Sequence, residues 1–196
     1  MKKLIKNSLI IVFFVISSIA AADNSIRLTE INGVSYVIGK NVPFTGKYVE
    51  LYQNKKINKE IYFNSGKMDG LYTVYDENGA KQFETTYKNG IENGLRTMWL
   101  TNGNKYSEEQ IVDGVENGAT VTWYGNGKKE TETFFKNGKE HGPSTTWSEE
   151  GMKILEVNYK EGKEEGIQTL WDENGKKQLE TTYKDGKKIK EVEFKK

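Results

Sequence analysis

The sequence of 196 residues contains no cysteine, a single histidine and only two prolines. Without cysteine the chain can form no disulfide, no thiolate metal site and no cysteine nucleophile, and one histidine cannot build a multi-histidine metal centre. Its 29 basic and 28 acidic residues give a net charge of +1, without the basic excess typical of nucleic-acid-binding proteins. Neither a G-x-S-x-G nor an H-E-x-x-H motif is present. We therefore expect no enzyme activity, no cofactor, no metal and no nucleic-acid partner.

Long hydrophobic runs are also absent, apart from one at the N-terminus. Residues 1–22 have the three parts of a secretory signal peptide: lysines within 1–7, the apolar run 9–16, and an A-x-A site at Ala20 and Ala22. The apolar stretch is shorter than the roughly 20 residues that span a membrane. We predict cleavage after residue 22 and export to the periplasm, the cell surface or the medium. The signal contains three lysines and no acid, so the remaining chain has a net charge of −2 and little reason to bind a membrane.

Glycine, in contrast, is abundant, and 17 of the 20 glycines fall into three columns with a period of 24 residues. The columns are Gly46, Gly70, Gly94, Gly118, Gly142 and Gly166; Gly66, Gly90, Gly114, Gly138, Gly162 and Gly186; and Gly79, Gly103, Gly127, Gly151 and Gly175. Lys55 stands where the third column would begin. We infer six tandem repeats over residues 46–189, preceded by an N-terminal β cap at 23–45 and followed by a terminal edge strand at 190–196.

Aromatic and acidic residues follow the same period. One aromatic column holds Tyr75, Trp99, Trp123, Trp147 and Trp171, a second holds Tyr87, Phe135, Tyr159 and Tyr183, and a column of glutamates holds Glu60, Glu84, Glu108, Glu132, Glu156 and Glu180. A lysine precedes each glutamate from Glu84 onward by three residues. These columns show that each repeat presents the same side chains at the same places.

Each repeat has the pattern of a β-hairpin. Two turn signals, such as Asn78-Gly79 and Asn89-Gly90, divide the repeat into two strands of about seven residues. No helical period fits between breakers so closely spaced. The predicted fold is all-β: an elongated antiparallel meander of tandem hairpins that forms a twisted, single-layer sheet of about 12 to 14 strands.

The faces of this sheet follow from the loop lengths. A three-residue loop at 77–79, a type I turn in which Gly79 takes the left-handed conformation and forms a bulge, and another three-residue loop at 88–90 place Tyr75 and Tyr87 on one side. The sequence then predicts one aromatic face that carries both aromatic columns. The glutamate column lies on the other face as a solvated acidic surface, and the lysines before it point away from it.

The segment GATVTWYGNGKKETETFFKNGKEHG, residues 118–142, resembles the MORN repeat in the variant found in bacterial proteins often labelled YwqK-like antitoxins. The resemblance covers residues 44–189 and depends on the glycine, aromatic and Asn-Gly positions together. It implies strings of β-hairpins that serve as interaction or scaffolding modules rather than as catalysts. The antitoxin type implies a protein that neutralises a toxic partner by binding it.

We expect the two aromatic columns to form the core of the sheet and, where uncovered, to bind a partner. The leading function is a non-catalytic interaction or scaffold module at the cell envelope, with a protein or a second copy as partner. Two alternatives are an antitoxin or immunity-type binder of a toxic partner, and recognition of a cell-wall glycan or choline through the aromatic stripe. The single histidine, His141, is interpreted as a turn residue.

Overall fold

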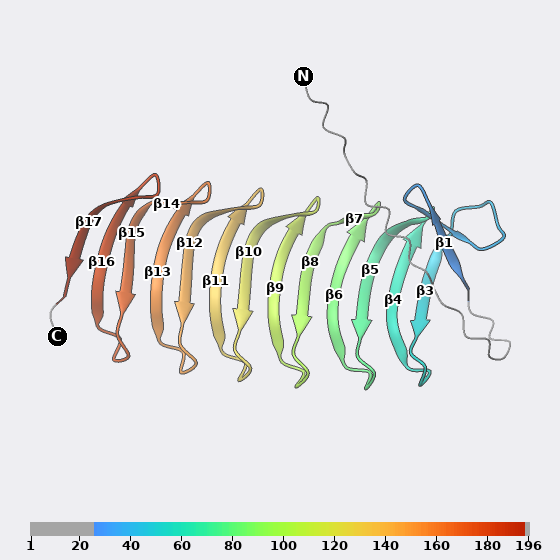
Figure 1. The fold of residues 1–196 in the computed structure, drawn as a ribbon, viewed down its shortest axis with the longest axis horizontal. Helices are drawn as coiled ribbons and strands as arrows, with labels where there is room; N and C mark the ends of the chain where they lie inside the picture. Colours follow the sequence, from blue (N-terminus) through green and yellow to red (C-terminus); the bar gives the residue numbers. More distant parts are fainter. Residues whose placement is uncertain (1–25, 195–196) are drawn as a thin grey trace, which may run out of the picture.

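The structure is a computed structural model that describes residues 26–194, and these residues form an all-β fold with no helix (Figure 1). The proposed signal peptide lies outside the described residues. The strands are β1 (Leu28–Ile31), β2 (Val34–Val37), β3 (Gly46–Leu51), β4 (Ile57–Asn64), β5 (Lys67–Tyr75), β6 (Lys81–Lys88), β7 (Ile91–Glu92), β8 (Gly94–Trp99), β9 (Lys105–Val112), β10 (Val115–Trp123), β11 (Lys129–Lys136), β12 (Lys139–Trp147), β13 (Lys153–Lys160), β14 (Lys163–Glu164), β15 (Gly166–Trp171), β16 (Lys177–Lys184) and β17 (Lys187–Glu193). Within the described part of the chain, no helix is present that could cross a membrane.

The strands from β3 to β17 form one antiparallel sheet in which sequence neighbours are also spatial neighbours. The short strands β7 and β14 pair with β6 and β13 beside the main path, which holds the other 13 of the 15 strands. Each repeat contributes one descending and one ascending strand, so the sheet grows along its length without a second layer (Figure 1). The predicted elongated meander of hairpins is therefore confirmed.

The lower turns of the hairpins are also as predicted. In the second repeat, the Asp76 N–H donates to the Ala80 carbonyl, and the Gly79 N–H donates to the Asp76 carbonyl, at 2.8 and 2.9 Å. These two bonds enclose a three-residue loop, and Gly79 takes the left-handed conformation with φ of 91°.

The expected faces of the sheet are wrong, because each of these turns is followed by a further β-bulge, in addition to the one predicted at the glycine. Tyr75 pairs with Lys81, but the preceding residue Val74 pairs with Phe83, so Gln82 is an extra residue in β6. One extra residue sends every later side chain of the strand to the opposite face. The same shift occurs beside Trp123, which therefore lies on the face opposite to Phe135.

The upper turns are shorter than predicted. Lys88 pairs directly with Ile91, which leaves a loop of only Asn89 and Gly90. Both residues have positive φ, 52° and 84°, the combination of a type I′ turn. With this turn, each column of side chains lies on the same face in the next repeat.

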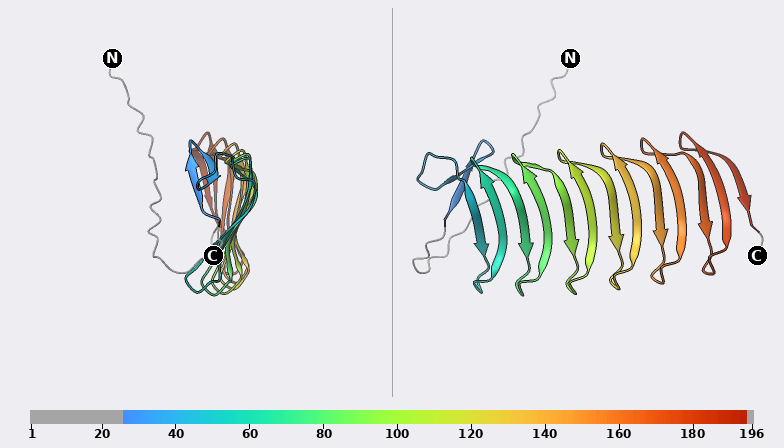
Figure 2. Two further views of the ribbon diagram at one scale, coloured as in Figure 1. Left: turned by 90° about the vertical axis from the view of Figure 1, so that its right-hand side faces the viewer. Right: turned by 180° about the vertical axis from the view of Figure 1, so that it is seen from behind.

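We name the two faces of the sheet by their aromatic columns. The tryptophan face carries the Tyr75 and Trp column, the glutamate column and the lysines from Lys81 onward. The tyrosine face carries the column of Tyr87, Phe135, Tyr159 and Tyr183, with Ile111 in the same series. The tyrosine face is turned toward the viewer in Figure 1, and the tryptophan face is seen from behind in the right panel of Figure 2.

The sheet has a thin core that lies within each face rather than between layers. Among the most buried side chains are Thr85 and Ile111 on the tyrosine face, 0% and 1% exposed, and Thr73 on the tryptophan face, 2% exposed. Larger neighbours on the same face cover them, because the strands bend, as the view along the sheet shows (Figure 2, left). Packing between nearest strands therefore stabilises this fold.

The hairpin of β1 and β2 lies against the tyrosine face at the first repeat (Figure 2, left). Phe44, which follows β2, packs edge-on against Phe63 with ring centroids 5.7 Å apart. The Gly66 N–H donates to the Phe44 carbonyl at 2.7 Å, as the Gly90 N–H does to Met68 one repeat later. The segment before the first repeat thus supplies the contact that a preceding repeat supplies elsewhere.

Candidate interaction surfaces

The structure divides the nine aromatic residues that the sequence places in one partner site. Tyr75, Trp99, Trp123, Trp147 and Trp171 lie on the tryptophan face, and Tyr87, Phe135, Tyr159 and Tyr183 lie on the tyrosine face. All nine are half-buried. The prediction of one aromatic stripe is therefore wrong, because the bulge separates the two columns.

A lysine of the preceding repeat lies over each tryptophan ring. The Lys81 Nζ is 5.2 Å from the centroid of the Trp99 ring. The corresponding pairs are Lys105 with Trp123 at 5.7 Å, Lys129 with Trp147 at 5.3 Å and Lys153 with Trp171 at 5.4 Å. Each is a cation–π contact that links one repeat to the next. Because each ring already carries an ammonium group of the protein, the tryptophans give no support to choline binding.

The same lysines neutralise the glutamate column. The Lys81 Nζ is 2.5 Å from a Glu84 carboxylate oxygen, and the equivalent lysines bond Glu108, Glu132, Glu156 and Glu180. The bulge brings each lysine and the glutamate three residues later to the same face. The expectation of a solvated acidic surface with lysines on the other side is therefore wrong: the column is a row of ion pairs.

A row along the upper part of the tryptophan face contains exposed and half-buried apolar residues, which Thr86, Gln110, Asn158 and Thr182 interrupt. We call it the apolar band, and its members are Tyr62, Leu71, Leu95, Ala119, Phe134, Pro143 and Ile167. Leu95 is 46% and Ile167 is 52% exposed. This band is not among the residues predicted from the sequence to bind a partner. Its signal was an apolar residue directly after the glycine of the first column in the second to sixth repeats.

The tyrosine face carries an ion-pair network near its middle. The Arg96 guanidinium bonds Glu92 at 2.5 Å through Nη2 and Glu109 at 2.6 Å through Nη1. The hydrogen bonds from Arg96 lower the pKa of Glu92 and, in return, raise the pKa of Arg96. These charged groups are held ionised by their partners, which is the pattern of a structural clamp rather than of an acid or base in catalysis.

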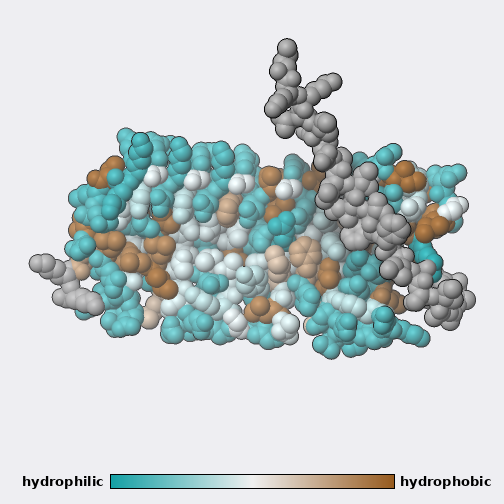
Figure 3. All heavy atoms as spheres, in the orientation of Figure 1, coloured by the Kyte–Doolittle hydropathy of each residue, from teal (hydrophilic) through white to brown (hydrophobic). Residues whose placement is uncertain are grey.

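Hydroxyl groups occupy the next strands of the tyrosine face. Thr122 and Thr131 are 2.7 Å apart through their hydroxyl oxygens, and so are Thr133 and Ser144. Figure 3 shows this region as a pale centre, with apolar residues toward β13–β16. The hydroxyls bond one another across strands and so satisfy much of their own hydrogen-bonding capacity.

The remaining ionisable groups do not assemble a reactive centre. Burial and the neighbouring Glu164 raise the pKa of Glu140. His141 lies inside β12 rather than in a turn, which corrects the sequence interpretation, and its Nδ1 is 3.4 Å from a Glu161 carboxylate oxygen. Among residues 26–194, no group of three His, Cys, Asp or Glu side chains is placed to hold a metal ion.

The architecture and the regular columns define this chain as a tandem β-hairpin repeat protein. A family model described as "MORN repeat variant" matches the chain at residues 68–89 and 164–185, which supports its assignment to the MORN repeat variants. No curated protein matches the chain significantly. MORN repeats are generally non-catalytic modules for protein or membrane interaction.

Proposed function

We propose that the protein is an exported, non-catalytic scaffold of the cell envelope that binds a protein partner through the apolar band. The observation that carries this proposal is the uncovered row of apolar side chains along one face of a single-layer sheet. Exposed apolar side chains that gather along one face of a protein often form an interaction site. A neutral ion-pair row borders the band, so apolar contact rather than charge would supply most of the affinity.

Glycine also brings neighbouring strands close together beside the band. Gly118, which precedes the band residue Ala119, has φ of 134°, and a Cβ at this position would lie 2.9 Å from Cβ of Gln110. Glycine therefore allows adjacent strands to approach closely beneath the band.

Charge substitutions within the band test the proposal. Leu95→Glu and Ile167→Glu should abolish recovery of the partner when the purified protein captures proteins from its own cell envelope. Both side chains are exposed, so the free energy of unfolding should change by only about 0.5 kcal/mol. The matched control is Tyr106→Glu, because Tyr106 is 46% exposed, like Leu95, but lies outside the band in β9. Recovery that survives both band substitutions would contradict the proposal.

The antitoxin or immunity-type role is the same binding mode with a particular partner. Its support is the resemblance of the repeats to those of antitoxin-labelled proteins. Mass spectrometry of the captured partner tests it: a secreted toxic enzyme whose activity falls on binding would favour it, and a structural envelope protein would contradict it.

A further inference from the structure

The first strand of the sheet has one unpaired edge. β3 pairs only with β4 among the described residues, whereas every other descending strand before β17 lies between two ascending ones. The Tyr52 N–H donates toward β4, to the Lys56 carbonyl. The backbone groups of successive residues in a strand point to alternate sides. The N–H and C=O groups of Lys47, Val49 and Leu51 therefore point away from β4, toward the unpaired edge. An unpaired row of this kind can accept another strand.

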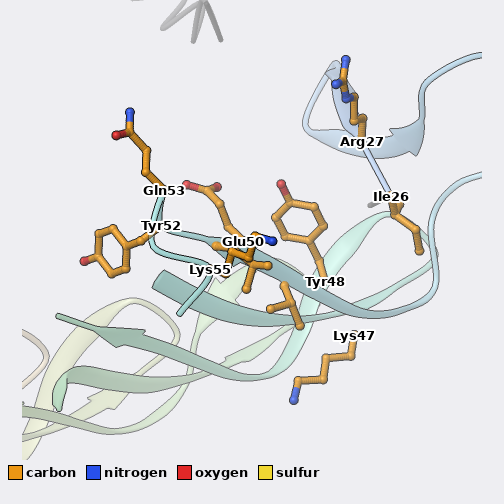
Figure 4. Close-up of a pocket in the computed structure, with 10 residues that line it drawn as sticks. Ile26, Arg27, Lys47, Tyr48, Glu50, Tyr52, Gln53 and Lys55 are labelled. Carbon is orange, nitrogen blue, oxygen red and sulfur yellow. The ribbon is translucent and has the colours of Figure 1, made fainter. Parts of the chain in front are cut away.

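A groove of about 680 Å³ lies along this edge. Its walls are Ile26 and Arg27 on one side, and residues 47–53 with Lys55 on the other. Tyr48 and Glu50 point to one side of β3 and Lys47 to the other, so the backbone between them faces the groove (Figure 4). The hairpin of β1 and β2 covers the sheet near Gly66, where the Ser35 N–H donates to the Gly66 carbonyl. The lower part of the β3 edge is not covered by this hairpin and lines the groove.

The groove carries uncompensated positive charge. Glu50 is bonded by Lys59 at 2.8 Å, and Lys47 is bonded by Glu60 at 2.5 Å, so these charges are balanced. Arg27 and Lys55 make no ion pair with any other residue of the described chain. An occupant with acidic side chains would complement them.

Lys55 is also strained. It occupies the position that is glycine in each of the next five repeats, and its φ is 66°. A non-glycine residue in the left-handed region costs of order 1–3 kcal/mol, and such residues often mark functional sites. Every other non-glycine residue with positive φ stands in a two-residue upper turn. At this position beside the groove, glycine would therefore give a more stable fold than lysine.

We propose that the free edge of β3 binds an extended, acidic peptide segment of a partner protein, which joins the sheet as an additional strand. The backbone groups of Lys47, Val49 and Leu51 would bond the peptide main chain, and Arg27 and Lys55 would select acidic side chains. The edge meets the apolar band at one place, where Lys47 pairs with the band residue Tyr62. The bonds to the peptide main chain and the charges of Arg27 and Lys55 do not involve the band, so the proposal does not depend on the function proposed above.

The test uses a fluorescent heptapeptide of sequence Thr-Glu-Val-Glu-Val-Glu-Thr with the purified protein. Anisotropy should show saturable binding, and hydrogen exchange should show protection of the Lys47, Val49 and Leu51 amides. A peptide with lysine for glutamate should not bind, and neither should a peptide N-methylated at alternate residues, because it cannot donate along the edge.

Lys55→Gly separates recognition from folding. It should raise the thermal midpoint by relieving the strain, yet weaken peptide binding about threefold, as expected for the loss of one exposed charge pair. Arg27→Gln should weaken binding similarly. Lys176→Glu, in the lower turn of the last repeat, should leave it unchanged.

Four results would overturn the proposal: no binding of the acidic peptide, equal binding of the N-methylated peptide, unchanged binding by Lys55→Gly, or equal weakening by Lys176→Glu. A peptide-free dimer with the same amides protected would assign the edge to a second copy, and would also overturn it.

Discussion

The two faces of the sheet differ in how strictly they repeat. On the tryptophan face, lysine, glutamate and tryptophan recur in nearly every repeat, and each lysine contacts the next tryptophan. On the tyrosine face, the character changes along the chain. Tyr72 and Phe83 pack at 5.8 Å near the start, Arg96 and hydroxyls follow, and Leu155 and Leu170 pair near the end. The tryptophan face therefore makes the same contacts between successive repeats. On the tyrosine face, the residues that pack together differ from repeat to repeat. Four predictions test this difference.

The largest effect is expected for the interior of the tyrosine face. Ile111→Ala should lower the free energy of unfolding by about 3 kcal/mol, because Ile111 is only 1% exposed and its removal leaves a cavity. Leu95→Ala on the tryptophan face should cost less than about 0.5 kcal/mol. Urea unfolding followed by tryptophan fluorescence measures both. Equal losses would show that the tyrosine face has no packed interior.

The second effect concerns the ion-pair network of the tyrosine face. Arg96→Met leaves Glu92 and Glu109 half-buried without their partner and should cost about 2 kcal/mol at neutral pH, less than for a fully buried pair. Because the folded-state pKa of Glu92 is lowered, its contribution is present above the unfolded pKa of about 4.3 and is lost as pH falls through the folded value. The difference between variant and wild type should therefore shrink in acid. A difference independent of pH would mean that Arg96 acts by packing alone.

A smaller effect tests the links on the tryptophan face. In a double-mutant cycle, Lys129→Met and Trp147→Leu should show a coupling of about 0.5–1 kcal/mol from the cation–π contact. Lys177→Met provides the comparison, since Lys177 bonds Glu180 but no later repeat offers it a tryptophan. If Lys177→Met costs as much as Lys129→Met, the salt bridge and not the tryptophan carries the effect.

The smallest effect is expected at Glu140, whose pKa is raised by burial and by Glu164. A raised carboxyl pKa means that the charged form destabilises the fold above that pKa, whereas below the unfolded pKa the cost disappears. Glu140→Gln should therefore stabilise the protein by a few tenths of a kcal/mol at pH 7, because solvent screens much of the repulsion. Thermal unfolding at pH 7 and pH 4 measures the gain, which should vanish at the lower pH. A loss at pH 7 would contradict the burial argument.

Sequence spacing predicts most of the architecture. The 24-residue period and the Asn-Gly pairs indicate the repeats and hairpins, and the three-residue loop ending at Gly79 is confirmed by its hydrogen bonds. The faces were predicted wrongly because Gln82 carries no mark of a bulge, and neither Tyr106 nor Glu130 at the same position shares its chemistry. A bulge is stabilised by the pairing of whole strands rather than by one residue type.

The candidate interaction surfaces could likewise be predicted only in part from the sequence. The aromatic columns are visible in the sequence, but their separation onto two faces and the lysine over each tryptophan depend on the bulge. The apolar band was within reach of the sequence, since Leu71, Leu95 and Ile167 recur directly after a glycine. The exposure of the band could not be predicted from the sequence, because only the assembled sheet decides which side chains are covered by their neighbours.

The sequence by itself determined the unit of this protein: its length, its two turns and its order along the chain, because glycine and asparagine control local backbone conformation. The tertiary structure decided which columns meet. One additional residue in the ladder between each descending strand and the ascending strand that follows it places lysine beside glutamate and tryptophan, leaves the apolar band uncovered and sets the thin core of the tyrosine face. These contacts join residues up to a repeat apart, so their geometry arises only when the strands pair.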